Sequence, residues 1–200
     1  MRVIEVGTTA LLLEVDAPHA WFAELWRRRA ASEFAAAEIV PGARTVLLDG
    51  VDTTLADRLP GWAPPAGAAT VEGPLVEIPV EYRGSDIDFV AGHWGTTAAG
   101  VSEILGATDF RVAFCGFAPG FAYLTGLPAH LTVPRLPTPR PKVPAGSVAL
   151  AGEYAGIYPT ASPGGWRLVG RTEVTLFDVD RQPPALLTPG TRVRFVAASS

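Results

Sequence analysis

The fold is decided by a stretch that reads Gly116-Phe117-Ala118-Pro119-Gly120-Phe121-Ala122-Tyr123-Leu124. It belongs to a longer segment, Phe114–Thr172, in which glycine and proline recur throughout. Both residues disfavour the interior of a helix. Loops that hold one shape while presenting aromatic and arginine side chains usually serve a ligand or a partner. The segment therefore predicts short strands joined by tight turns, and it holds most of the candidate functional residues.

Short apolar runs bounded by turn residues predict further strands on both sides of this stretch. The expected strands are Leu75–Val80, Arg111–Cys115, Ser147–Ala151, Gly156–Tyr158, Trp166–Val169, Val174–Phe177 and Arg192–Val196. Between the first and second of these strands we expect two short helices, one capped by Ser85 or Asp86 and the other by Thr96 or Thr97. Many short strands are typical of a closed antiparallel barrel or a sandwich, so residues 74–200 are predicted to form an all-β domain.

The N-terminal third has a different pattern. Its expected elements are a hairpin over Arg2–Val6 and Ala10–Val15, a helix capped by Asp16, a second hairpin over Ala36–Val40 and Arg44–Leu48, and a short helix over Thr53–Leu59. This β-β-α-β-β-α order predicts an α+β domain with helices on one side of an open sheet. Residues Pro60–Pro74 are rich in Pro, Gly and Ala and form the expected linker. The first domain, with its linker, is therefore predicted to span residues 1–73.

The composition narrows the class of protein. A net charge of −4 argues against a nucleic-acid partner. Arg83 is the only Lys or Arg between Glu81 and Glu103, so the two middle helices do not suit a DNA-binding helix-turn-helix. No apolar run is long enough to span a bilayer, and the single cysteine, Cys115, fits a reducing compartment. We therefore expect a cytoplasmic protein with no membrane partner.

Residue types in the Gly/Pro-rich segment suggest a binding site for an anion. Its candidate pocket-lining residues are Phe117, Phe121, Tyr123, Tyr158 and Trp166, and its candidate cations are Arg135, Arg140, Lys142 and Arg171. Arginine binds carboxylate or phosphate bidentately, and the backbone N–H groups of Gly164 and Gly165 are also suited to an anion. An alternative is that the glycines and prolines only shape turns while the arginines cover the surface. Residue types alone leave both interpretations open.

Several chemistries find no support in the sequence. It has no G-x-G-x-x-G, Walker A or G-x-S-x-G motif. Ser147 and Cys115 are better explained as a turn-closing serine and a buried small side chain than as nucleophiles. His19, His93 and His130 are far apart and show no metal-ligand spacing, so no metal site is expected.

Several motifs occur in one order along the second half of the chain. They are Gly116–Leu124, the Pro-Arg pairs at 134–135 and 139–140, Val143–Val148, Gly156–Pro159, Ser162–Trp166 and Leu168–Thr172. Together they resemble the B subunit of bacterial ATP-dependent 5-oxoprolinase, in the KipI and allophanate hydrolase subunit 1 family with its carboxyltransferase domain, subdomain C and D. The resemblance is dense over residues 116–195 and looser but collinear before them.

The resemblance implies a β-β-α-β-β-α domain followed by a cyclophilin-like barrel. It also implies partner subunits C and A, which together with this chain open 5-oxoproline to L-glutamate at the expense of ATP. The chain alone is expected to be inactive, with the ATP site outside it. A regulatory protein that inhibits a histidine kinase, and a subunit of an allophanate hydrolase or urea carboxylase type of carboxyltransferase, are the alternatives within the family.

We expect the functional residues to surround a pocket shared with the C subunit. His93 matches the first histidine of the family and is the candidate catalytic residue, whereas Leu105 stands where family members often carry a second histidine. The candidate substrate-binding residues are Arg135, Arg140, Tyr158, Ser162, Gly164, Gly165 and Arg171.

Overall fold

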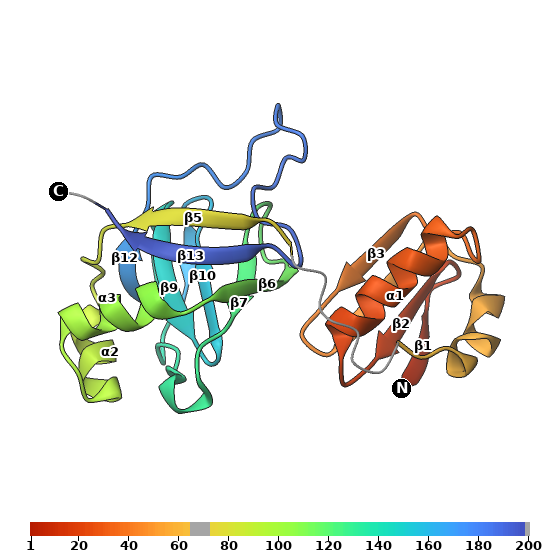
Figure 1. Cartoon of the computed structure of the whole chain (residues 1–200), viewed down its shortest axis with the longest axis horizontal. Coiled ribbons are helices and arrows are strands. Elements are labelled where there is room, and N and C mark those ends of the chain that lie inside the picture. Colours follow the sequence, from red (N-terminus) through yellow and green to blue (C-terminus); the bar gives the residue numbers. More distant parts are fainter. Residues whose placement is uncertain (65–72, 199–200) are drawn as a thin grey trace. The chain divides into compact units, whose positions relative to one another are not determined.

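The computed structural model describes residues 1–64 and 73–198. The chain divides into two compact units, Met1–Glu72 and Gly73–Ser200 (Figure 1). Most of the expected linker, Pro60–Pro74, lies outside the described residues. Among the described helices, none is both long enough and apolar enough to cross a bilayer.

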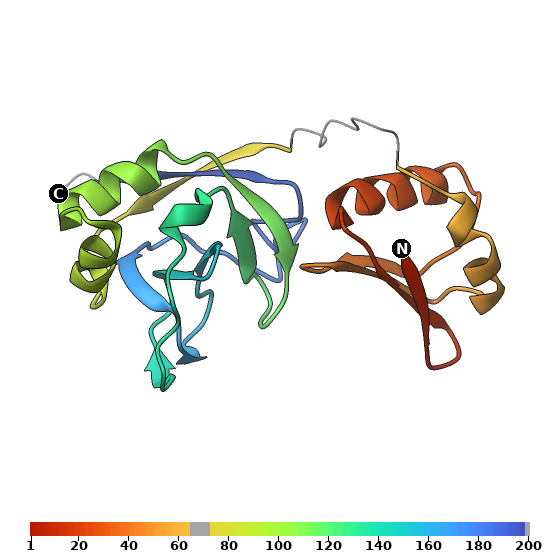
Figure 2. The ribbon, with the colours of Figure 1, turned by 90° about the horizontal axis from the view of Figure 1, so that it is seen from below.

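The N-terminal unit is a four-stranded antiparallel sheet with one α-helix. Its elements are β1 (Arg2–Val6), β2 (Ala10–Glu14), α1 (Pro18–Ala30), β3 (Glu38–Pro41) and β4 (Thr45–Asp49), and the strand order is β1-β2-β4-β3. Helix α1 covers one face of this sheet (Figure 2). Trp21 and Leu25 of α1 pack on Leu11, Leu13 and Leu48 of the strands. The two predicted hairpins are thus confirmed.

Two details of the predicted N-terminal unit differ. The second helix is a 3-10 turn, η1 (Thr53–Asp57), followed by the short turn η2 (Leu59–Gly61). Asp52 caps η1 by accepting a hydrogen bond from the backbone N–H of Thr54 at 2.9 Å, and Pro60 follows too soon for an α-helix to continue. Helix α1 is preceded by Ala17 without a side-chain cap, so Asp16 is not its N-cap.

The second unit is built on a mixed seven-stranded sheet. In sheet order the strands are β12 (Arg167–Arg171), β9 (Ser147–Ala151), β10 (Tyr154–Ile157), β7 (Ala122–Thr125), β6 (Phe110–Cys115), β13 (Arg192–Ala197) and β5 (Leu75–Val80). Glu81, next to β5, exchanges backbone hydrogen bonds of 2.8 and 2.9 Å with Arg171 at the end of β12. The sheet therefore nearly closes into a barrel.

Close approach at the closure requires a glycine. A Cβ atom at Gly170 would lie 2.6 Å from Cγ1 of Val80 and 2.8 Å from the carbonyl oxygen of Glu81. Two helices, α2 (Ile87–Trp94) and α3 (Ala98–Ala107), follow β5 and pack against β12 and β13. The remaining elements are the turn η3 (Ala129–Leu131) and a separate two-stranded ribbon of β8 (Arg140–Val143) and β11 (Ser162–Gly164).

Three predictions for this unit need correction. Strands β5 and β13 pair in parallel, so the sheet is not wholly antiparallel, and α2 and α3 make the unit more than all-β. The predicted strand Val174–Phe177 is irregular, with one isolated bridge between Phe177 and Ala185. The guanidinium of Arg181 donates to the carbonyl oxygens of Thr175 and Leu176 at 3.2 and 3.0 Å. The Leu176 carbonyl also accepts the backbone N–H of Leu186 at 2.8 Å, so side-chain and backbone donors share this segment.

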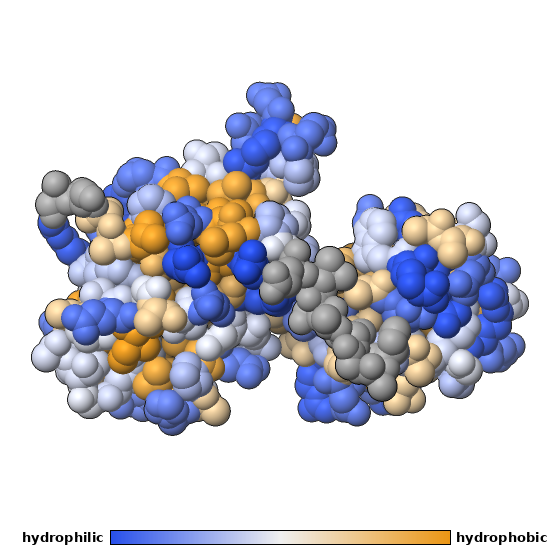
Figure 3. Space-filling model, viewed as in Figure 1, coloured by the Kyte–Doolittle hydropathy of each residue, from blue (hydrophilic) through white to orange (hydrophobic). Residues whose placement is uncertain are grey.

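Alternation along β9 separates an inner core from an outer wall. Val148 and Leu150 belong to the main core of the barrel. Ala149 and Ala151 belong to a second cluster on the opposite face of the strand, and we call this face the outer wall. A different part of the surface, where β5 and β13 run, mixes hydrophobic and hydrophilic residues (Figure 3), and there Arg194 of β13 is 3.9 Å from Glu77 of β5. The aromatic candidates Phe121, Tyr123, Tyr158 and Trp166 belong to this second cluster.

Candidate functional site

A floor of small residues on the outer wall supports large aromatic rings. Strands β9 and β10 contribute Ala149, Ala151 and Gly156 to this floor. A Cβ atom at Gly156 would lie 3.0 Å from Cζ3 of Trp166 and 3.1 Å from Cζ of Phe121. The absence of that side chain lets both rings lie against the backbone of the barrel.

Phe121 is the centre of the aromatic cluster. Its ring centroid lies 5.1 Å from that of Tyr123, 5.3 Å from that of Tyr158 and 5.4 Å from that of Trp166, in each case edge to face. Such arrangements are the favoured ones for aromatic pairs. Phe121, Tyr158 and Trp166 are almost fully buried, so their positions are fixed by packing before any ligand binds.

The hydroxyl group of Tyr158 is enclosed by its neighbours. A Cβ atom at Gly164 would overlap the hydroxyl oxygen, so glycine is required there. Burial raises the pKa of Tyr158, while a hydrogen bond with the backbone of Trp166 and the positive charges of Arg135 and Arg140 act in the opposite direction. The two arginines thus lie near one phenol, which stays protonated at neutral pH.

Arg135 is the most available cation at this site. Its guanidinium carbon lies 5.8 Å from the centroid of the Trp166 ring, and the residue is exposed. Within residues 1–64 and 73–198 it has no ion pair with a carboxylate. An exposed guanidinium beside an indole face is suited to a small carboxylate that carries an apolar ring.

Arg140 is held by a buried carboxylate. Its Nη2 atom donates to Oδ1 and Oδ2 of Asp86 at 2.9 and 2.8 Å, and its Nη1 atom donates to the carbonyl oxygen of Trp166 at 3.3 Å. Asp86 is only 7% exposed and also accepts the backbone N–H of Leu168 at 2.7 Å. Arg140 therefore fixes the ribbon to α2 and β12, and its guanidinium already has a carboxylate partner.

His93 belongs to a chain of contacts that leads from α2 toward Arg135. Its Nε2 atom lies 3.0 Å from the carbonyl oxygen of Thr132, and since a carbonyl only accepts, Nε2 carries the hydrogen. The His93 ring stacks on Phe89 at 6.0 Å, and Phe89 lies 3.6 Å beneath the guanidinium of Arg167. His93 thus holds the segment that precedes Arg135. Its predicted proton transfer stays a prediction.

Gly165 and Ser162 line the same ribbon in different ways. The carbonyl oxygen of Gly165 accepts the backbone N–H of Leu136 at 2.8 Å, which ties the ribbon to the loop that follows Arg135. The hydroxyl of Ser162 is buried and, in the described residues, has no hydrogen-bond partner. These positions give the ribbon its shape, and their binding of an anion stays a prediction.

Arg171 lies apart from the other candidates. It stands at the far end of β12 from Arg167, is exposed, and pairs with Glu173 at 3.0 Å. The structure therefore brings Arg135, Arg140 and Tyr158, with Gly164 and Gly165, around Trp166. It leaves Arg171 outside that group.

Two important residues were missed by the sequence interpretation. Asp86 was considered only as a helix cap, yet its carboxylate binds Arg140 and lies 3.7 Å from Nη1 of Arg167. Arg167 was not singled out, although it adjoins Trp166 within the motif series. The sequence feature that could have indicated Arg167 is its position between the apolar residues Trp166 and Leu168.

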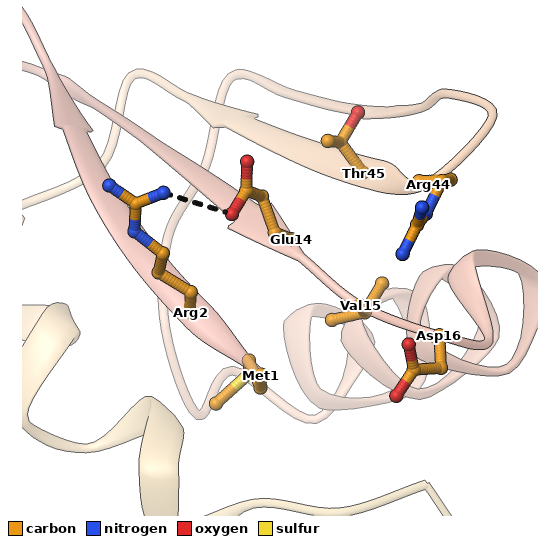
Figure 4. Close-up of a pocket in the computed structure, with 7 residues that line it drawn as sticks. All are labelled: Met1, Arg2, Glu14, Val15, Asp16, Arg44 and Thr45. Atoms are coloured by element: carbon orange, nitrogen blue, oxygen red, sulfur yellow. Dashed lines mark hydrogen bonds and ion pairs between the residues drawn. The ribbon is translucent and has the colours of Figure 1, made fainter.

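The described residues give little support to a metal site or a cysteine nucleophile. No group of three or more His, Cys, Asp or Glu side chains there is placed to hold a metal ion. Burial raises the pKa of Cys115 to about 11, which suits a structural thiol rather than a nucleophile. A surface hollow of about 520 Å³ in the N-terminal unit is lined by Met1, Arg2, Glu14, Val15, Asp16, Arg44 and Thr45 (Figure 4). It contains none of the predicted functional residues.

The fold and the site together define a barrel protein that presents an arginine and an aromatic cluster on its outer wall. The chain belongs to the family of the carboxyltransferase domain, subdomain C and D, which matches residues 1–187. The resemblance stated from the motifs is thereby confirmed. Because this family match covers most of both units, it applies to the whole chain and not to the barrel alone.

Similar proteins include the B subunits of 5-oxoprolinases. That of Escherichia coli O157:H7 is 40% identical over 207 residues, which cover 98% of this chain and 95% of that protein. That of Bacillus subtilis (strain 168) is 42% identical over 128 residues, 62% of this chain and 53% of that protein. Both similarities exceed the level at which a common fold is in doubt.

Solved structures show the same fold within longer chains. The crystal structure of TTHA0988 is 33% identical with a TM-score of 0.78, and the match covers 96% of this chain but 40% of that chain. The urea amidolyase of K. lactis is 21% identical with a TM-score of 0.75, over 98% of this chain and 15% of that chain. At that identity the second likeness concerns the fold alone.

Proposed function

We propose that this chain is the B subunit of a 5-oxoprolinase complex that converts 5-oxo-L-proline to L-glutamate with consumption of ATP. The observation that carries the proposal is the 40% identity to the Escherichia coli B subunit over 95% of that protein. The proposal includes subunits A and C as partners, a cytoplasmic location and a cyclophilin-like class for the barrel. The chain acts only within the complex.

The outer wall suits the substrate that this function requires. 5-Oxoproline is a five-membered lactam with one carboxylate. Arg135 is the cation that binds the carboxylate, and the buried indole of Trp166 positions its guanidinium. Arg140 and Asp86 act as positioning residues, because they fix the Trp166 carbonyl and the ribbon beside it.

ATP supplies phosphoryl activation of the lactam in this proposal, and its site is assigned to the partner subunits. The N-termini of α2 and α3 do not offer a phosphate site. Helix α2 begins beside the buried carboxylate of Asp86, and the side chain of Thr97 already accepts the N–H of Gly100 at the start of α3. Helix N-termini bind phosphate through free N–H groups and positive charge, which these two lack.

Reconstitution with subunits A and C tests the proposal. The expected result is glutamate release from 5-oxoproline and ATP with all subunits present, and background release when this chain is omitted. Full activity without this chain would contradict the proposal. The alternatives, a histidine-kinase inhibitor and an allophanate hydrolase or urea carboxylase type of protein, gain no specific support, since the urea amidolyase likeness concerns the fold alone.

A further inference from the structure

Phe117 is exposed and has an unusual backbone conformation. Phe117 is 60% exposed, which is more than any other exposed Phe or Trp of the described residues. Its φ angle is +73°, in the left-handed region that glycine prefers. Neither burial nor backbone preference explains a phenylalanine at this position. Strained residues of this kind persist where the surrounding structure holds them for a function.

The turn that carries Phe117 is rigid. The N–H of Gly116 donates to the carbonyl of Phe121 at 3.2 Å, and the N–H groups of Ala118 and Phe121 donate to the carbonyls of Gly116 and Ala118, each at 2.9 Å. Gly120 packs so closely on Phe177 that a Cβ atom would lie 2.7 Å from its Cβ. The backbone at Phe117 is therefore fixed, and the residue it carries is exposed.

The surroundings of Phe117 join it to the candidate site. Its ring meets Phe121 edge to face at 5.2 Å and Tyr158 at 6.1 Å. Gly116 and Pro119 beside it are not buried, so a neighbouring molecule can approach the turn closely. A partner that covers Phe117 thus also covers the edge of the aromatic cluster.

We infer that Phe117 is the anchor by which this chain docks on its carboxyltransferase-like partner, the C subunit. The inference rests on the proposed function. Aromatic side chains, Phe included, are enriched at protein interfaces, and a preorganised segment loses little conformational freedom on binding. The match to TTHA0988 covers only 40% of that chain, so a fold of this kind occurs joined to a further polypeptide segment. Within the proposed function, we take the C subunit to be the separate counterpart of such a segment.

Binding measurements with the purified C subunit test this inference. Phe117→Gly removes the ring and accepts the positive φ, and Phe117→Asn removes the ring while tolerating that φ. Both variants are expected to melt at or above the temperature of the unsubstituted chain, and to weaken binding of the C subunit by about 30-fold or more. Trp26→Ala is the matched control, since Trp26 is an exposed aromatic residue of α1 in the other unit, and it is expected to leave binding unchanged.

The possible outcomes separate the inference from the proposed function. If the unsubstituted chain binds the C subunit and supports glutamate release, but both Phe117 variants bind within about twofold of it, the docking role is wrong and the function stands. A fall in melting temperature with unchanged binding would likewise show that Phe117 is only structural. If the unsubstituted chain neither binds the C subunit nor supports activity, the function and the docking role both fail.

Discussion

Removal of the Asp86 carboxylate is predicted to destabilise the barrel unit strongly. In the folded chain this buried group accepts two hydrogen bonds from Arg140 and one from the backbone N–H of Leu168, and it lies 3.7 Å from Arg167. Asp86→Ala leaves both arginines, which are only partly exposed, without their counter-charge. It also leaves the buried N–H of Leu168 without an acceptor. The substitution therefore removes a shared partner rather than one isolated contact.

The expected loss of stability follows from the hydrogen bonds and ion pairs that Asp86 makes. A hydrogen bond to a charged group contributes about 1.5–3 kcal/mol, but bonds that share one carboxylate are not additive. Breaking a buried ion pair by removing one partner costs about 3–5 kcal/mol, which is the value expected here. For a domain of this size the melting temperature falls by roughly 10 °C or more.

Hydrogen exchange with mass spectrometry is the suitable assay, because it reports each unit separately. Peptides from Gly73–Ser200 are expected to lose protection in Asp86→Ala, most of all around Leu168, while peptides from the N-terminal unit are unaffected. Glu14→Ala serves as the control, since its ion pair with Arg2 is exposed and is worth less than about 1 kcal/mol. Asp86→Ala within about 1 kcal/mol of the unsubstituted chain would refute the reasoning.

Three further predictions concern the site, the cysteine and the N-terminal unit. Arg135→Ala is expected to raise KM for 5-oxoproline about tenfold or more with little change in kcat, whereas Arg171→Ala changes neither. Equal effects in steady-state kinetics would contradict the assignment. Because burial raises the pKa of Cys115 to about 11, its thiol should react with a disulfide reagent far more slowly when folded than in urea, and equal rates would count against this. The hydrogen bond from Arg27 lowers the pKa of Glu24 from 4.5 to about 2, so its stabilisation is full above pH 4.5 and is lost as pH falls toward 2. Urea unfolding of Glu24→Gln should lack this loss, and an unchanged pH profile would show that Glu24 is not its source.

Local patterns predicted most of the strands. Ser147–Ala151 is predicted and observed with the same limits, because its residues are apolar on both faces and turn residues bound it. The sequence offered Thr96 or Thr97 as a helix cap, and the cap is Thr97, since its side chain accepts the N–H of Gly100. Val174–Phe177 has the same local pattern, but the side chain of Arg181 donates to its carbonyls. No periodicity within four residues reveals that donor.

The site was predictable by residue type but not by pairing. His93, Arg135, Arg140, Tyr158 and Arg171 were expected around one pocket. Arg135, Arg140 and Tyr158 lie around Trp166, whereas Arg171 lies apart from them. The pairing of Arg140 with Asp86 spans 54 positions, and it depends on how the ribbon meets α2. Sequence spacing carries no information about such a contact, which is why Arg140 was expected to be free for substrate.

The distribution of charge explains why one arginine is the better substrate contact. Arg140 and Arg167 share the carboxylate of Asp86, and Arg171 pairs with Glu173. A substrate carboxylate at any of these would have to displace an existing partner. At Arg135 it displaces only water, so the full charge-assisted interaction is available for binding.

Two side chains near this site are candidates for the proton transfers that open a lactam. That reaction needs a base for the attacking water and a donor for the departing nitrogen. Burial raises the pKa of Tyr158, so its hydroxyl stays protonated at neutral pH. His93 donates Nε2–H to the carbonyl of Thr132, which leaves its Nδ1 atom as an acceptor. His93 therefore stays the predicted proton-transfer residue, and the proposed function assigns the other bond-breaking groups to the partner subunits.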